Sequence, residues 1–155
     1  MTHCIFCDIV AEEASASVVY RDERCMAFMD LFPMGEGHVL IIPNEHHVFL
    51  DELDDDMRSH LFTVAYKVYS AQKKIGLQVD GTNLVINDGK AAQQTVPHVH
   101  IHLVPRTQGD VPKLTLRFLK GLVLKIGLSK IISDESKRKR LDDIALRLSQ
   151  QLKEG

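Results

Sequence analysis

Short, largely apolar blocks rich in β-branched residues recur over the first two thirds of the chain, a pattern typical of strands. These blocks cover residues 18–22, 24–30, 38–42, 82–86 and 96–104. Asp22-Glu23 lies between the first two blocks and predicts a hairpin turn, and Pro43 and Pro105 predict where two later strands end. Because short loops join most of these strands, we expect an antiparallel sheet of about five strands.

One long segment instead repeats its apolar residues with the helical period. Its stripe, interrupted only by the last residue, consists of Met57, Leu61, Val64, Ala65, Val68 and Gln72. The acidic residues 54–56 precede this stripe, where the helix dipole favours negative charge, and Gly76 is a natural stop. We therefore predict a helix over 53–75 and interpret the acidic triplet as its start rather than as a metal site. A short helix over 4–11 completes an α+β fold.

Charge divides the chain more sharply than its overall composition does. Residues 1–112 carry 8 basic and 16 acidic side chains, a net charge of −8, whereas residues 113–155 carry 11 basic and 5 acidic side chains, a net charge of +6. We therefore expect one domain over 1–112 and a basic C-terminal extension over 113–155 that packs on or near it.

The extension contains a second helical stripe. Its members are Leu141, Ile144, Ala145, Leu148 and Leu152. Ser133 and Asp134 are suited to the start of this helix, while residues 113–132 permit either helix or strand. We interpret the basic run 137–140 as a solvated helix face attracted to the acidic domain. An acidic partner or nucleic acid is the alternative occupant.

The composition excludes several classes of protein. With 155 residues, 45% hydrophobic residues and a formal net charge of −2, the chain is typical of one soluble globular domain rather than a disordered one. No run approaches the ~18 apolar residues of a membrane span, and the N-terminus lacks a secretory pattern. Three cysteines, an odd number, disfavour a disulfide framework and favour a reducing, cytoplasmic environment.

Candidate chemistry is concentrated in residues 98–104, which read His-Val-His-Ile-His-Leu-Val. Alternate side chains of a strand share a face, so the pattern predicts His98, His100 and His102 in one row about 6.6 Å apart. Such a row can span a phosphate or a phosphoanhydride. Imidazole can serve as nucleophile, acid or base near neutral pH, and the central His100 is the best candidate nucleophile at phosphorus.

Two other interpretations of this row stay open at this point. Three alternating histidines can hold a catalytic zinc ion, or they can simply form the polar face of a strand. The strict alternation with an unbroken apolar face favours a functional row over the second interpretation.

The heptapeptide resembles the signature of the histidine triad (HIT) superfamily of nucleotide hydrolases and transferases. The resemblance covers about residues 3–106, because further segments fall where the family has them. These segments are Phe28-Met29-Asp30, residues 37–43, Asn87 eleven residues before His98, and Gln94-Thr95 just before the triad.

The resemblance implies a compact α+β homodimer that binds a nucleoside monophosphate moiety and forms a nucleotidyl adduct on His100. It implies that His98 and His102 orient this nucleophile and assist proton transfer, and that His38 buttresses the triad. Asp30 would accept hydrogen bonds from ribose hydroxyls, which suits a carboxylate.

The remaining implied contacts are with phosphate and base. Asn87, Gln94 and Thr95 would contact phosphate oxygens. Five residues match an apolar base pocket: Ile5, Phe6, Ile9, Phe28 and Leu31. Ordinary core packing is the alternative role for these side chains. Gln93 departs from the family, which often has glycine there, so a positive φ at this position would strain the phosphate loop.

Cys4 and Cys7 form a Cys-x-x-Cys pair that alone permits a redox pair, half of a zinc site or two buried thiols. A subset of HIT proteins of bacterial type resembles this chain and uses a Cys₂His₂ set for structural zinc. That resemblance implies Cys4, Cys7, His46 and His98 as ligands, with His47 as the alternative to His46, and no metal for catalysis. We expect Cys25 in the core.

The leading hypothesis is a nucleotidyl hydrolase or transferase that attacks the α-phosphate of a dinucleoside polyphosphate or a nucleoside phosphoramidate. The alternative is a nucleotide-binding scaffold or sensor protein with little catalysis. A small nucleotide is the expected partner in both cases, with no membrane partner, and nucleic acid is disfavoured.

Overall fold

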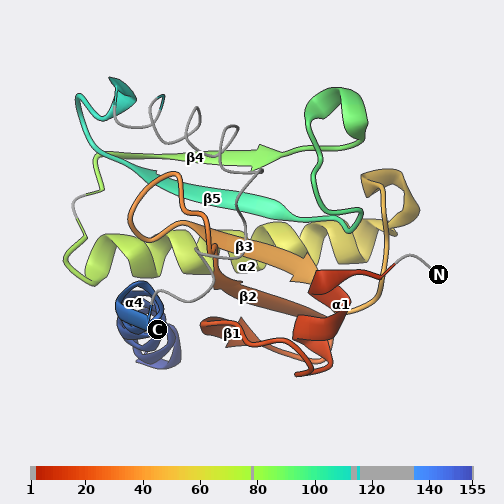
Figure 1. Ribbon diagram of the computed structural model, residues 1–155, viewed down its shortest axis with the longest axis horizontal. Coiled ribbons are helices and arrows are strands. Elements are labelled where there is room, and N and C mark those ends of the chain that lie inside the picture. The colour runs from red at the N-terminus through yellow and green to blue at the C-terminus, as the bar shows by residue number, and fades with distance from the viewer. Residues whose placement is uncertain (1–2, 78, 113–114, 116–134, 155) are drawn as a thin grey trace.

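The computed structural model describes residues 3–77, 79–112, 115 and 135–154 and contains one five-stranded antiparallel sheet (Figure 1). Across the sheet the strand order is β1-β2-β3-β5-β4. The strands are β1 (Val18–Arg21), β2 (Cys25–Met29), β3 (Val39–Pro43), β4 (Gly81–Ile86) and β5 (Ile101–Arg106). The predicted α+β fold and its antiparallel sheet are confirmed.

The helices also lie close to their predicted positions. They are α1 (Ile5–Val10), α2 (Asp55–Lys74) and α4 (Glu135–Glu154), with short 3-10 turns η1 (Leu50–Glu52) and η2 (Lys90–Ala92). The Asp54 side chain caps α2 by accepting a hydrogen bond from the Met57 N–H at 2.6 Å. Gly76, with φ +75°, follows the helix as expected.

Two strand ends differ from the prediction. β5 begins at Ile101 rather than at residue 96, because the Val99 N–H donates to the His47 carbonyl oxygen at 2.7 Å instead of to a neighbouring strand. Pro43 is the last residue of β3, at the predicted stop, whereas Pro105 does not end β5, which continues to Arg106. β3 and β5 pair with each other only over Val39–Ile41 and Ile101–Leu103, so each proline lies where its strand has a partner on one side only.

Helices cover the two faces of the sheet unequally. The face toward α2 and α4 holds the larger core, with Ile41, Ile101 and Leu103 packed against Leu61 and Leu148. On the opposite face, Phe6 of α1 packs against side chains of β2 and β3. The histidine row lies on this second face, next to Phe6.

The C-terminal helix α4 packs against β1 and α2, at the lower left of the sheet in Figure 1. Leu141, Ile144, Ala145 and Leu148 are buried there, as the stripe predicts. The expected helix start at residues 133–134 and the open segment 113–132 lie outside the described residues, apart from Thr115. The division of the chain at residue 112 stays a prediction. None of the described helices is long and apolar enough to cross a membrane.

Candidate functional site

The three histidines of the row lie together beside α1. His98 and His100 come just before β5 and are buried, and His102 is the second residue of the strand. The ring centroids of His100 and His102 are 4.8 Å apart. The Phe6 ring makes edge contacts with His98 at 5.8 Å and with His100 at 5.4 Å. The row therefore forms as predicted, although only its last member belongs to a regular strand.

One hydrogen bond fixes the tautomer of His100. Its Nδ1 lies 2.7 Å from the His98 carbonyl oxygen, which can only accept, so Nδ1 carries the proton. The lone pair is then on Nε2. Burial lowers the pKa of His100 and favours the neutral ring. Chemically, this is a neutral imidazole with one nitrogen prepared for nucleophilic attack.

His38 supports the row from β3's N-terminal end. The Met34 N–H donates to its Nδ1 at 3.2 Å, so the proton of the ring is on Nε2, which donates to His102 Nδ1 at 3.0 Å. Burial, and the nearby charge of His100, lower the pKa of each ring to about 4, so both are neutral at neutral pH. This pair holds the His102 ring in one orientation.

Asp30 connects His38 to the loop between β2 and β3. Its Oδ2 lies 3.2 Å from His38 Nδ1, and its Oδ1 accepts the Phe32 N–H at 2.8 Å. Burial raises the pKa of Asp30, while the Phe32 N–H, then His102 and His100 in their protonated forms, and then the Lys137 charge act to lower it. Sequence reasoning did not associate Lys137 with this site.

The segment 87–95 forms a loop around η2. Gln93 has φ 65° and ψ 29°, so the strain expected for a non-glycine residue is present. The Gln94 side chain holds the loop: its Oε1 accepts the Gly89 N–H and its Nε2 donates to the Val48 carbonyl oxygen, both at 2.8 Å. Asn87 is half-buried and Thr95 is exposed.

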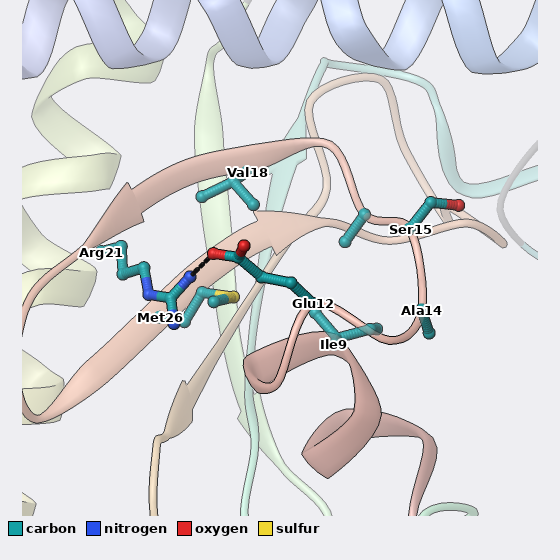
Figure 2. A pocket seen from close by; sticks show the side chains of 8 residues that line it. Ile9, Glu12, Ala14, Ser15, Val18, Arg21 and Met26 are labelled. Atoms are coloured by element: carbon teal, nitrogen blue, oxygen red, sulfur yellow. Dashed lines mark hydrogen bonds and ion pairs between the residues drawn. The ribbon is translucent and has the colours of Figure 1, made fainter.

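The five apolar candidates do not share one environment. Phe6 and Phe28 are buried with Ile9 packed against them, Leu31 packs against the core on the other face, and Ile5 is 43% exposed. A cavity of about 230 Å³ lies between α1, the segment after it and β1. Figure 2 shows side chains that line it, with Glu12 and Arg21 paired. Of the five candidates, only Ile9 lines this cavity.

A second cluster combines four potential zinc ligands, with all four donor atoms within 4.8 Å of one another: Cys4, Cys7, His46 and His98. The Cys7 Sγ lies 3.2 Å from His46 Nδ1 and 3.7 Å from His98 Nδ1, and the Cys4 Sγ lies 3.5 Å from His98 Nδ1. Ligands at ordinary zinc distances in a tetrahedron have sulfur and nitrogen about 3.5 Å apart, so the donor set fits this ion.

The hydrogen bonding of the cluster also favours a metal. His98 Nε2 lies 3.0 Å from the Pro43 carbonyl oxygen, so Nε2 carries the proton and the bare Nδ1 faces the thiols. His47, the predicted alternative to His46, is not in the cluster, and its Nε2 lies 3.6 Å from Glu45 Oε2. Cys25 is fully buried in the core, as predicted.

His60 lies against the β1–β2 hairpin. Its Nε2 and the Tyr20 hydroxyl both lie 2.8 Å from Asp22 Oδ2, while Asp22 Oδ1 accepts the N–H groups of Arg24 and Cys25. Because hydrogen bonds occupy both carboxylate oxygens, we assign this cluster a structural role.

The HIT domain family model matches residues 11–109. A HIT-like protein of Methanocaldococcus jannaschii is 43% identical over 107 residues, which cover 69% of this chain and 81% of that one. The structure of a zinc-bound histidine triad family protein from Mycobacterium smegmatis superposes with a TM-score of 0.76 at 34% identity, covering 97% of this chain and 94% of that one.

The adenylylsulfatase HINT3 of Arabidopsis thaliana is 34% identical over 107 residues, 69% of this chain and 54% of that protein. The chain belongs to the HIT family, whose members are nucleotide hydrolases and transferases.

We expect acid to destabilise the fold through His38 and His102. Their pKa of about 4 in the folded protein is below the ordinary value of 6.5, so the unfolded chain binds more protons between these two values. The stabilisation is complete above about pH 6.5 and is lost as the pH falls towards 4. Each buried ring contributes on the order of 1–3 kcal/mol.

Urea unfolding of the wild type and of His38→Asn between pH 4.5 and 8 measures this effect. The difference in unfolding free energy between the two proteins should shrink as the pH falls. A difference that stays constant over this range would contradict the neutral His38–His102 pair.

Proposed function

We propose that this chain is a nucleotidyl hydrolase or transferase in which His100 attacks the α-phosphate of a dinucleoside polyphosphate or a nucleoside phosphoramidate. The observation that carries the proposal is the His100 Nδ1 to His98 carbonyl hydrogen bond of 2.7 Å, which leaves Nε2 bare. Nε2 bonds to phosphorus as the bond to the leaving group breaks. Water then cleaves the nucleotidyl-histidine, releasing the nucleoside monophosphate and restoring His100.

The other residues have supporting roles in this proposal. His102 passes a proton to the leaving group, His98 orients His100 through its carbonyl, and His38 holds His102. Asp30 accepts ribose hydroxyls. Asn87 and Thr95 contact phosphate oxygens, and Gln94 shapes their loop. The base packs against apolar side chains drawn from Ile5, Phe6, Ile9, Phe28 and Leu31.

Replacing His100 by Ala should reduce turnover by at least about 1,000-fold, because no other group supplies the nucleophile. His60→Ala, outside the site, is the matched control and should keep wild-type turnover. Adenosine phosphoramidate and diadenosine polyphosphates are suitable substrates, with release of adenosine monophosphate as the measurement.

Trapping a labelled nucleotidyl group and mapping it to His100 by mass spectrometry would support the covalent intermediate. Normal turnover by His100→Ala would overturn the assignment. Tight nucleotide binding by the wild type with no turnover of any of these substrates would instead favour the scaffold or sensor alternative.

We infer that Cys4, Cys7, His46 and His98 hold a structural zinc ion. The zinc-bound relative from M. smegmatis supports this inference, as does the fit of the four donor atoms. A bound ion would tie α1 to the segments that carry His46 and His98, and so to the carbonyl that orients His100. A catalytic three-histidine zinc is less well supported, because His98 Nδ1 faces the thiols and His100 Nδ1 faces a carbonyl.

The purified protein should contain about one zinc ion per chain by elemental analysis, and a strong chelator should lower its melting temperature. Cys7→Ser should lose the metal, whereas Cys25→Ser, a change of the same kind in the core, should keep it. A metal-free wild type whose melting temperature does not respond to added zinc would contradict this inference.

We also propose a homodimer that pairs through the edge strand β4. No described strand lies on its outer side, and Leu84 and Val85 are 43% and 38% exposed. Such an edge presents backbone N–H and C=O groups that can pair with the same strand of a second copy. Sedimentation equilibrium should give twice the chain mass, and Leu84→Glu should shift it towards monomer, whereas Leu146→Glu on the exposed face of α4 should not. A monomeric wild type would reject the proposal.

We place the protein in the cytoplasm. Its three cysteines are all thiols in the structure, and two of them are needed in reduced form for the proposed zinc site. Fractionation of cells that make the protein tests this location, and recovery from an oxidising compartment would exclude it.

A further inference from the structure

The first turn of α4 lies against the loop between β2 and β3. Arg140 Nη2 lies 2.7 Å from Glu36 Oε1, and the Lys137 ammonium sits 5.0 Å from the centre of the Phe32 ring. The turn has a defined position because Leu141 and Ile144, directly after it, are buried in the core. The basic run therefore meets a particular part of the domain rather than only solvent.

That loop leads directly to the triad. The Phe32 N–H donates to Asp30 Oδ1 at 2.8 Å, Asp30 Oδ2 lies 3.2 Å from His38 Nδ1, and His38 hydrogen bonds to His102. A contact between Lys137 and the Phe32 ring thus acts on the residue whose N–H orients the Asp30 carboxylate. Lys137 is linked to the nucleoside end of the proposed site by two successive contacts.

The positive charge of Lys137 also acts on the Asp30 carboxylate. Burial raises the pKa of Asp30, and Lys137 is among the groups that oppose this effect. Burial lowers the pKa of His100 and of His102 and so disfavours their charged forms, whereas a lysine ammonium stays charged at neutral pH. An ionised carboxylate accepts hydrogen bonds at both oxygens, while a protonated one accepts fewer. The Lys137 charge therefore favours the form of Asp30 that binds hydroxyl groups.

We propose that Lys137 is a positioning residue for Asp30, through which the first turn of α4 sets a preference for ribonucleotides over 2′-deoxyribonucleotides. The inference rests on the proposed function, because that function assigns the ribose hydroxyls to Asp30. This proposal assigns Lys137 of the basic run 137–140 a role within the site, whereas the sequence alone suggested a solvated helix face or a surface for a partner.

The test compares adenosine phosphoramidate with its 2′-deoxy analogue on the full-length protein. Wild-type protein should prefer the ribonucleotide, and Lys137→Ala should reduce that preference on the order of 3- to 10-fold. The loss should be in KM for the ribonucleotide, with kcat nearly unchanged and the deoxy substrate little affected. Lys137→Arg should restore the preference, because it keeps the cation over the Phe32 ring.

Lys139→Ala is the matched control, since it removes the same charge from an exposed position of the same turn. It should behave as wild type. The proposal is overturned if the wild type does not discriminate, if Lys137→Ala keeps the wild-type ratio, if it affects both substrates equally, or if Lys139→Ala has the same effect.

Failure of the proposed function has a different signature, because no form of the protein would then turn over either substrate. Calorimetric binding of adenosine monophosphate and its 2′-deoxy analogue then tests the inference without catalysis. A lower preference for the ribonucleotide in Lys137→Ala alone would support it, and an unchanged preference would reject it.

Discussion

The hydrogen bond from His100 Nδ1 to the His98 carbonyl oxygen is the constraint on which the rest of the site depends. It determines which nitrogen of His100 carries the proton, and so which nitrogen can bond to phosphorus. A neighbouring residue supplies the acceptor, but that carbonyl is held in place from elsewhere. The His98 ring is fixed by the Pro43 carbonyl and lies against Phe6 of α1. The proposed nucleophile is therefore oriented by the strand and helix that surround His98.

The same arrangement explains why two chemistries share one short segment. His98 uses its carbonyl for His100 and its ring for the cysteine cluster, so the proposed zinc ion would stabilise the backbone that orients the nucleophile. His102, beyond His100, accepts a hydrogen bond from His38, whose other ring nitrogen accepts the Met34 N–H and lies 3.2 Å from Asp30. α4 reaches this second group of contacts through Phe32, whose N–H donates to Asp30, the residue that we propose binds the ribose.

Much of the fold follows from the sequence because its signals are local. The stripe of α2, its acidic first turn and the β-rich blocks predict five strands and a long helix, and the structure agrees. The predicted start of β5 at residue 96 was wrong because the Val99 N–H donates to the His47 carbonyl oxygen, a partner distant in the sequence. Pro105 does not end β5 because it lies beyond the overlap of β5 with β3, which depends on the sheet order.

In the candidate site, too, local sequence patterns predict some features, while others depend on contacts that only the fold creates. The spacing of the triad predicts the histidine row, but it cannot choose the tautomer of His100, which depends on a carbonyl position. His46 and His47 are equivalent in sequence, and only the fold places the first beside Cys7. Lys137 and Phe32 are far apart in the chain, so their contact has no local signal.

Nitrogen chemical shifts of the His100 ring test the central claim most directly. In ¹⁵N-labelled protein at pH 7, the account predicts a neutral ring with the proton on Nδ1 and a bare Nε2. A ring protonated on Nε2, or on both nitrogens at this pH, would contradict it.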